Sequence, residues 1–221
     1  MKIIELKESV TSSNDAEAAR LRQELKAKRT VMINLMSSPG AGKTTMLSRT
    51  ITDLKDRYHI AVMEADIASS VDAERIAALG AEAIQVHTDG MCHMDAGMTR
   101  EAVENLECDQ YDLLFLENIG NLICPAEYDT GATHNVMILS VPEGDDKPLK
   151  YPLMFEKSDV LLITKTDTLG YFNFDIEKCC SRVRKLNPQI TIFPISAKAN
   201  EGMDKWEKWI EDRIAEAKAG E

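Results

Sequence analysis

The segment from Asn34 to Thr45 constrains the fold of this chain more than any other stretch. It reads NLMSSPGAGKTT, and it connects an apolar run at 31–36 to a helical pattern in which Leu47 and Ile51 recur. Glycines in such a turn let consecutive backbone N–H groups point inward around a phosphate, and the positive end of the following helix adds to the attraction. The sequence therefore predicts a strand, a phosphate-binding loop and a helix, in that order.

The residues of this loop resemble a nucleotide-binding motif with one departure. Lys43 is expected to reach the β- and γ-phosphates of a nucleotide, and the Thr44 hydroxyl to bind Mg²⁺. The usual motif, G-x-x-x-x-G-K-[ST], begins with glycine, whereas this chain has Ser37 at that position. An ordinary glycine-rich turn is the alternative, and the order of strand, loop and helix argues against it. We expect nucleotide contacts from Gly40, Ala41, Gly42, Lys43, Thr44 and Thr45.

Composition and charge argue against several classes of partner. The net charge of the 221-residue chain is −11, which would repel a phosphate backbone, so we expect no nucleic-acid ligand. No apolar run approaches the ~20 residues of a membrane span, and no signal-peptide pattern is present, so we expect no membrane partner. Five cysteines, few and odd in number, favour free thiols and a cytoplasmic location.

Seven apolar segments of strand length alternate largely with helical patterns. They lie at 31–36, 60–64, 83–88, 113–116, 136–141, 160–163 and 190–193. This alternation predicts an α/β fold of the P-loop NTPase type, with a doubly wound, mostly parallel sheet of about seven strands and helices on both faces. In such a sheet the ligand binds at the carboxyl ends of the strands.

Residues 1–30 are expected to form an N-terminal arm and a peripheral helix, and 31–221 the nucleotide-binding domain. A short strand or arm is predicted before residue 13. Asn14 with Glu17 resembles a capping box that opens a helix through about Ala27. The helix has a narrow apolar face that indicates packing on the edge of the domain, formed by Ala18, Leu21 and Leu25.

Acidic residues follow two of the predicted strands. Glu117 ends the most apolar one, where a carboxylate would support Mg²⁺ directly or through water, and Gly120 occupies the place of a γ-phosphate sensor in D-x-x-G loops. Asp66 ends a second strand and is expected to position Mg²⁺ or the attacking water. The alternatives are a polar strand end and a helix-capping aspartate. We therefore assign catalytic roles to Lys43, Asp66 and Glu117, and the Mg²⁺ site to Thr44, Asp66 and Glu117.

Two later loops indicate which base the nucleotide carries. The sequence TKTD at 164–167 follows an apolar run in the position of a guanine-reading N-K-x-D motif. Asp167 would accept two hydrogen bonds that only guanine offers, and Lys165 would lie along the base. Thr164 replaces the usual Asn, which is expected to weaken a tether between loops. A second guanine-contacting loop follows the last strand and is formed by Ser196, Ala197 and Lys198. Together these loops favour GTP and GDP over adenine nucleotides.

Sulfur and nitrogen donors form the remaining group of chemical interest. Cys92 and His93 are adjacent, and Cys124 follows about thirty residues later, each just past a predicted strand. Adjacent residues bind one ion from a loop or serve ions shared between subunits, because on a strand their side chains point to opposite faces. Thiolate and imidazole suit Ni²⁺ or Zn²⁺. Spacing alone favours a simpler interpretation, two buried thiols and a surface histidine.

Considered together, these motifs resemble the HypB family of hydrogenase nickel-incorporation GTPases. The resemblance covers nearly the whole chain beyond the N-terminal helix. It is carried by SPGAGKTT at 38–45, EADIA at 64–68, GMCHMDA at 90–96, ENIGNLICP at 117–125 and EGDD at 143–146, with the guanine loop in addition. The histidine-rich tract and N-terminal cysteine cluster of some metal-handling relatives are not seen in this sequence.

The resemblance implies a SIMIBI-type GTPase with slow intrinsic turnover and a metal site embedded in residues 31–221. It implies that the protein forms a homodimer with GTP, and that Cys92, His93 and Cys124 bind Ni²⁺, with Zn²⁺ as a second metal, at the dimer interface. It also implies a nickel-delivery partner protein and a [NiFe]-hydrogenase large-subunit precursor as recipient.

Two other interpretations remain open at this point. An accessory GTPase of the urease type resembles the same fold but carries a Cys-Pro-His motif, whereas Cys92 and His93 are adjacent here. A small-molecule kinase with a phosphate loop would use an arginine-rich lid, and no such cluster is visible in the sequence.

Overall fold

The computed structural model describes the backbone of residues 6–66, 71–107 and 110–220, with the side chains of 6–10, 66 and 71–73 outside the description. The strands are β1 (Val31–Ser37), β2 (Ile60–Asp66), β3 (Glu82–His87), β4 (Leu113–Glu117), β5 (His134–Ser140), β6 (Val160–Thr164) and β7 (Thr191–Pro194). The α-helices are α1 (Leu6–Lys28), α2 (Lys43–Leu54), α3 (Val71–Ala78), α4 (Ala96–Glu104), α5 (Cys124–Glu127), α6 (Lys147–Lys150), α7 (Pro152–Glu156), α8 (Ile176–Leu186) and α9 (Met203–Ala219). Two 3₁₀ turns are η1 (Val141–Glu143) and η2 (Thr166–Tyr171).

The described strands form one sheet in the order β3-β2-β4-β1-β5-β6-β7, and every neighbouring pair is parallel. The predicted α/β fold with a mostly parallel sheet of about seven strands is therefore confirmed. Every residue of β1, β4 and β6 is buried, as expected for parallel strands that helices cover on both faces. The strand order places β1 and β4 at the centre of the sheet, so the phosphate loop lies at the middle of its carboxyl edge.

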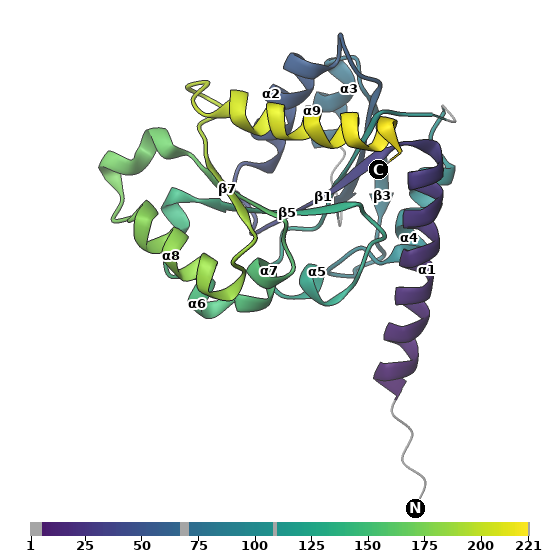
Figure 1. Ribbon diagram of the computed structural model, residues 1–221, viewed down its shortest axis with the longest axis horizontal. Helices are drawn as coiled ribbons and strands as arrows, with labels where there is room; N and C mark the ends of the chain where they lie inside the picture. The colour runs from purple at the N-terminus through teal and green to yellow at the C-terminus, as the bar shows by residue number, and fades with distance from the viewer. Residues whose placement is uncertain (1–5, 67–70, 108–109, 221) are drawn as a thin grey trace, which may run out of the picture.

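Helices cover both faces of the sheet (Figure 1). On one face, α2, α3 and α9 bury a cluster that includes Leu47, Ile76 and Trp206. On the other face, α1 and α4 cover β2 and β4 with residues such as Leu21 and Ala102, while α5, α7 and α8 cover β5 and β6. Because side chains alternate along a strand, each strand contributes alternate residues to the two faces.

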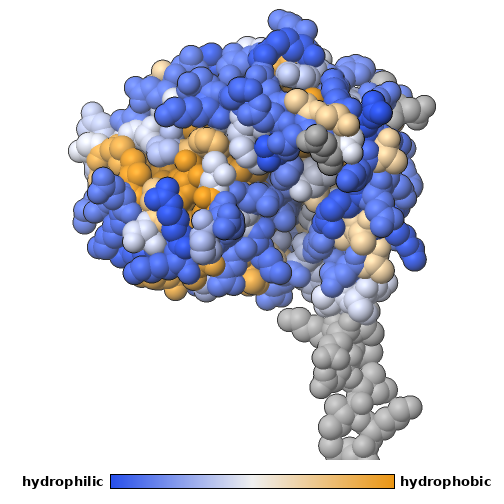
Figure 2. Space-filling view, in the orientation of Figure 1, coloured by the Kyte–Doolittle hydropathy of each residue, from blue (hydrophilic) through white to orange (hydrophobic). Residues whose placement is uncertain are grey.

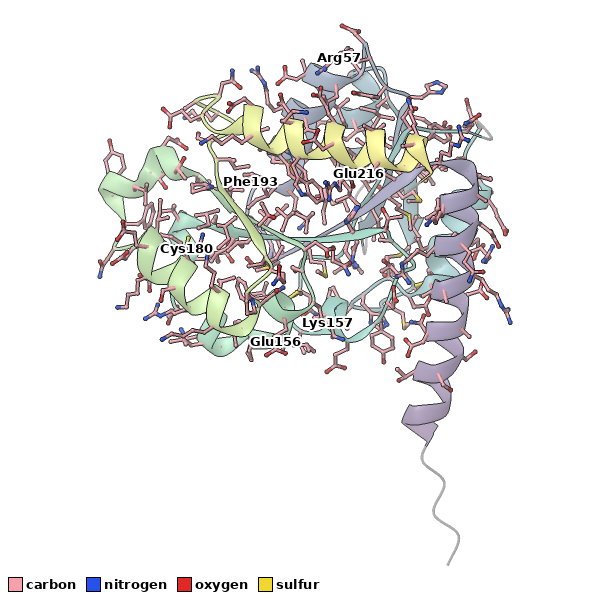
Figure 3. All side chains as sticks on the ribbon, in the orientation of Figure 1. Arg57, Glu156, Lys157, Cys180, Phe193 and Glu216 are labelled. Atoms are coloured by element: carbon pink, nitrogen blue, oxygen red, sulfur yellow. The ribbon has the colours of Figure 1, made fainter. Side chains whose placement is uncertain are left out.

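The edge strand β7 leaves part of the apolar interior accessible. Ile192 and Phe193 are only half-buried there, as is Cys180 on α8. Figure 2 shows an apolar area on the left of an otherwise mostly hydrophilic face, and Figure 3 places Phe193 and Cys180 on this side of the molecule. Among the described residues, no helix combines the length and apolar character needed to cross a bilayer.

The start of the first helix differs from the prediction. The helix α1 begins at Leu6, so the arm or strand expected before residue 13 is wrong for residues 6–12, and residues 1–5 lie outside the described part of the chain. Asn14 lies inside α1 instead of capping it. Its amide donates to the Asp129 carbonyl at 2.9 Å and accepts from the Ala96 backbone N–H at 2.9 Å, so its side chain docks α1 against the start of α4. The predicted packing face is confirmed by the burial of Ala18, Leu21 and Leu25.

A carboxyl group between α2 and α9 makes stability depend on pH. Burial and a hydrogen bond with Asp53 raise the pKa of Glu207 to about 7, from an ordinary value of 4.5. The folded protein therefore keeps a proton that the unfolded chain releases, and this contribution to stability is lost as pH rises from about 4.5 to 7. We expect Glu207→Gln to raise the free energy of unfolding near pH 8 by roughly 1 kcal/mol, discounted for partial exposure.

Urea unfolding at about pH 8 and about pH 4 checks this expectation. Near pH 4 the carboxyl is protonated in both states, so Glu207→Gln should change little there. Glu201→Gln, at an exposed position, is the matched control. Equal effects of Glu207→Gln at the two pH values would contradict the expectation.

Candidate nucleotide and metal sites

A cavity of about 550 Å³ opens at the carboxyl ends of β1, β2 and β4. Its walls are the phosphate loop, the ends of β2 and β4, and Arg75 of α3. The predicted residues that line it are Gly40, Gly42, Lys43, Thr44, Thr45, Glu117, Gly120 and Lys165. Ala41 belongs to the same loop but is 1% exposed and packs in the core. The sequence therefore located the cavity, although it did not indicate Glu64 or Arg75 as lining residues.

Two glycines give the phosphate loop its shape. Gly40 and Gly42 have φ of +75° and +96°, which side-chain-bearing residues rarely adopt. Gly42 is also the N-cap of α2 and provides no side-chain oxygen to bind the first N–H groups of the helix. These N–H groups remain available for a phosphate at the positive end of the helix dipole.

Ser37, the departure from the usual motif, has a specific contact in the structure. It is the last residue of β1 and is completely buried. Its Oγ accepts a hydrogen bond from the Lys43 Nζ at 2.9 Å and donates one to the Ser38 carbonyl at 2.7 Å. A glycine would lack this acceptor, so serine orients the lysine side chain beneath the loop.

Carboxylates and a hydroxyl gather at the floor of the cavity. The Thr44 Oγ1 donates to Glu117 Oε1 at 3.2 Å, and Glu117 is only 7% exposed. Asp66 ends β2 as predicted, but its side chain lies outside the described part of the chain. The parallel register pairs Glu64 of β2 with Glu117 of β4, which places a second carboxyl beside the first. The hydroxyl and the carboxylate are oxygen donors of the kind that Mg²⁺ prefers.

The predicted guanine loop is tied to the phosphate loop. Thr164 Oγ1 donates to the Ala41 carbonyl at 2.6 Å, and Lys165 Nζ donates to the Gly40 carbonyl at 2.7 Å. Thr164 therefore does tie the two loops together through its hydroxyl, and the expectation that this tether is weaker than one made by Asn stays a prediction. Lys165 has φ of +59°, a conformation that directs its side chain back over the phosphate loop.

The second guanine loop contacts the first through one hydrogen bond. Ser196 Oγ donates to Asp167 Oδ1 at 2.6 Å and accepts from the Ala199 backbone N–H at 3.1 Å. Asp167 is exposed. Ala197 and Lys198 follow in the same turn, half-buried and exposed respectively. The two loops, far apart in the sequence, thus contact each other, although Asp167, Ser196, Ala197 and Lys198 are not among the residues that line the cavity.

Cys92, His93 and Cys124 meet in space. One ligand atom from each lies within 4.8 Å of the others, and the Sγ atoms of Cys92 and Cys124 are 2.8 Å apart. The cysteine and histidine come from the loop after β3, so adjacent residues do face one point, as a loop permits. The alternative of buried thiols and a surface histidine is wrong, because His93 is 7% exposed whereas Cys92 is exposed.

The surroundings of these residues affect His93 and Cys124 in opposite ways, because metal binding needs a neutral imidazole and a deprotonated thiol. His93 stacks on Tyr128 with ring centroids 3.8 Å apart, and burial lowers the pKa of His93, so its imidazole is neutral near pH 7. The hydrogen bond with Cys92, together with burial, raises the pKa of the Cys124 thiol. A bound cation would displace that proton and gain a thiolate, which suits Ni²⁺ or Zn²⁺.

A short segment connects the cavity to these ligands. Asn118, 1% exposed, donates through its amide to Asn34 of β1 at 3.1 Å and accepts from the Met94 backbone N–H of the metal loop at 3.2 Å. Asn121 accepts from the Cys124 backbone N–H at 3.4 Å and donates to the Cys92 carbonyl at 3.5 Å. Side chains of one segment thus contact both sites.

The other cysteines have different surroundings. Cys179 is completely buried in α8, and burial raises its pKa to about 12. Cys180 is half-buried beside it, with a pKa also raised by burial. Cys108 lies outside the described residues. Neither cysteine of α8 belongs to the metal-ligand group.

Comparison with known proteins agrees with this geometry. The family described as CobW/HypB/UreG, nucleotide-binding domain, matches residues 31–194. The chain is 47% identical over 210 residues to the hydrogenase maturation factor HypB of Escherichia coli strain K12, which covers 95% of this chain and 72% of the relative. It is 41% identical over 219 residues to the hydrogenase/urease maturation factor HypB of Helicobacter hepaticus, covering 97% and 90%.

Solved structures give the same result. HypB from Helicobacter pylori in complex with nickel superposes with a TM-score of 0.87 at 38% identity, covering 92% of this chain and 96% of that one. HypB from Archaeoglobus fulgidus gives 0.86 at 32% identity, covering 92% and 99%. The signal recognition particle receptor FtsY from Elizabethkingia anophelis shares the fold alone, with 0.56 at 11% identity and coverage of 89% and 72%. The chain belongs to the HypB hydrogenase maturation factors of the CobW/HypB/UreG family.

Proposed function

We propose that this protein hydrolyses GTP and uses the nucleotide cycle to bind and release nickel for insertion into a [NiFe]-hydrogenase precursor. The observation that carries the proposal is that the segment 117–124 connects the two sites. It begins with Glu117, which ends β4 and lines the nucleotide cavity, and it ends with Cys124, which belongs to the Cys92-His93-Cys124 group. The relatives named above as hydrogenase maturation factors support the same role. The remaining nickel-enzyme alternative is urease, which the name of the Helicobacter hepaticus relative includes.

In the proposed reaction this chain mainly positions the nucleotide and compensates its charge. The N-terminus of α2 and Lys43 bind the phosphates, and Gly120 approaches the γ-phosphate from the cavity wall. Thr44 and Glu117, whose oxygens suit the ion, would hold Mg²⁺, with Asp66 assigned beside them. The ion would supply positive charge that offsets the charge of the phosphates during hydrolysis. Among the described residues that line the cavity, Arg75 is the single arginine, whereas a small-molecule kinase would be expected to have an arginine-rich lid there.

Guanine specificity is assigned to Asp167, held in place by Ser196. We expect Asp167→Ala to weaken GTP binding by about 1–3 kcal/mol, because two guanine donors lose their acceptor, while ATP binding changes little. Competition of GTP and ATP against a fluorescent GDP analogue measures the discrimination.

Lys43→Ala is the matched comparison for this measurement. It should weaken both nucleotides together, because it removes a phosphate contact that the base does not influence. Equal competition by GTP and ATP for the unmutated protein would contradict the guanine assignment.

Nickel is the cargo in this proposal, held by Cys92, His93 and Cys124, and Zn²⁺ is able to occupy the same donors. We expect Cys92→Ser, His93→Ala and Cys124→Ser each to weaken Ni²⁺ and Zn²⁺ binding at least about tenfold, since each removes one of three ligands. Binding should also weaken as pH falls, because the pKa of Cys124 is raised and the metal must displace its proton. Competition with a chromophoric chelator at several pH values measures both effects.

The control for the metal measurement is Cys180→Ser, which removes a half-buried thiol of α8 outside the ligand group. It should leave both metal affinities unchanged. Unaltered affinity in a Cys92→Ser, Cys124→Ser double variant would remove the metal assignment altogether.

We assign the surface around these ligands to a homodimer interface that forms with GTP. Met91 and Ile123, next to the ligands Cys92 and Cys124 in the chain, are large apolar residues that are 39% and 55% exposed. Three protein ligands also leave a coordination position for a donor from a second copy. The proposed further partners are a nickel-delivery protein and the hydrogenase large-subunit precursor, and we expect these exchanges to occur in the cytoplasm, where thiols remain reduced.

Coupling between the sites is the central test of the proposed function. If GTP in place of GDP changes nickel affinity tenfold, about 1.4 kcal/mol, then nickel must change the relative affinities for GTP and GDP by the same factor. We expect Asn121→Ala to reduce this coupling while each site still binds its own ligand, because Asn121 contacts Cys92 and Cys124 but does not line the cavity. Nickel titrations with GDP and with a non-hydrolysable GTP analogue measure it.

Asn105→Ala, on the exposed end of α4, is the matched control. Gly120→Ala is less suitable, because a Cβ on Gly120 would lie 3.0 Å from the backbone N of Pro39 and would disturb the phosphate loop itself. Identical nickel affinities in both nucleotide states of the unmutated protein would contradict the coupling.

A further inference from the structure

Glu64 is an acidic residue in the interior of β2 that motif spacing does not single out. It is 3% exposed, and it follows the buried residues Ile60 and Val62 on the face of the sheet that α2 covers. Alternation along the strand sends Ala61 and Met63 to the other face. A carboxyl group in this position costs free energy through loss of hydration, so its placement in a row of aliphatic side chains requires a physical reason.

The sheet register shows which residues lie next to Glu64. Glu64 pairs with Glu117 on the neighbouring strand β4, and the two residues share the α2 face. Both line the nucleotide cavity, in which the Thr44 hydroxyl donates to Glu117 at 3.2 Å. A hydroxyl and two carboxyl groups therefore lie together at the floor of the cavity, below the N-terminus of α2.

Charge decides what this floor can bind. Two carboxylates on adjacent strands repel each other, and the phosphates of a nucleotide would add more negative charge to the same largely buried space. Lys43, Arg75 of the cavity wall and the N-terminus of α2 offset part of this charge. A divalent cation that prefers oxygen ligands offsets the remainder, and Mg²⁺ usually keeps several waters that carboxylates bind in turn.

We propose that Glu64 is a positioning residue for the nucleotide-bound Mg²⁺, acting with Glu117 to make nucleotide binding depend on that ion. The inference rests on the proposed GTP binding, and it adds a residue of β2 to the Thr44, Asp66 and Glu117 set. Without Mg²⁺, the two carboxylates repel the phosphates. With Mg²⁺, the same pair holds the hydrated ion from below.

The test compares the dissociation constant of a fluorescent GDP analogue in saturating Mg²⁺ and in EDTA. In the unmutated protein we expect removal of Mg²⁺ to weaken binding at least about a hundredfold, or about 2.7 kcal/mol. In Glu64→Gln, which keeps the size of the side chain, this ratio should fall at least tenfold, chiefly because binding in EDTA becomes tighter. A residue with only a structural role would weaken binding equally in both conditions.

A second variant separates the effect of the negative charge at position 64 from the effect of side-chain length. Glu64→Asp keeps the negative charge but sets it back by one methylene, so binding in EDTA should stay within twofold of the unmutated protein. The Mg²⁺ concentration needed for half-maximal GDP binding should rise at least fivefold. This measurement requires no turnover. Glu101→Gln, an exposed change of the same charge on α4, should alter neither quantity.

The outcomes distinguish this inference from the proposed function. If Glu64→Gln and Glu64→Asp both bind GDP with the Mg²⁺ dependence of the unmutated protein, the role of Glu64 is overturned while GTP binding stands. If Glu64→Gln does not fold, Glu64→Asp decides the question alone. If the unmutated protein binds no guanine nucleotide in Mg²⁺, the proposed function itself is wrong.

Discussion

The burial of Asn118 is the constraint on which the arrangement of both sites depends. It follows the end of β4, is 1% exposed, and donates to Asn34 of β1 while accepting from the backbone of Met94 in the metal loop. Its own backbone N–H donates to the Leu35 carbonyl at 3.1 Å, which extends the sheet one residue beyond the strand. An unsatisfied amide in such an interior costs about 1–3 kcal/mol, so these partners hold the segment in one position.

Much of the fold follows from periodicity in the sequence. Seven apolar segments were sufficient to predict seven strands, and the pattern is clearest for β1, β4 and β6, which are covered on both faces and have no polar side to obscure it. The start of α1 could not be predicted in the same way. Asn14 resembles an N-cap locally, but its side chain is used in contacts with Asp129 and Ala96 that are distant in the chain. Local hydrogen-bonding capacity is visible in a sequence, whereas the partner that satisfies it is not.

In the candidate sites too, local motifs could be predicted from the sequence, whereas contacts between distant residues could not. Motif spacing located the phosphate loop, since this loop depends on a few consecutive residues. Spacing alone could not decide whether Cys92, His93 and Cys124 form a group, because their approach depends on strand order and on the loop after β3. The contacts made at the departures from the motifs could not be predicted either: the Ser37 hydroxyl accepts a hydrogen bond from Lys43, and the Thr164 hydroxyl donates one to the phosphate loop.

Close packing provides a physical route for the proposed coupling between the two sites. The Cα of Gly120 lies so near Pro39 of the phosphate loop that a Cβ there would come within 3.0 Å of the Pro39 backbone N. A phosphate that moves this loop would therefore move Gly120 with it or open a gap, and close packing opposes the gap. Cys124 follows four residues later, a distance of at most ~14 Å along an extended chain, and Asn121 ties the intervening turn to Cys92. In the proposed coupling, a displacement of the phosphate loop would thus reach a thiol ligand through direct contacts, without a change in the fold.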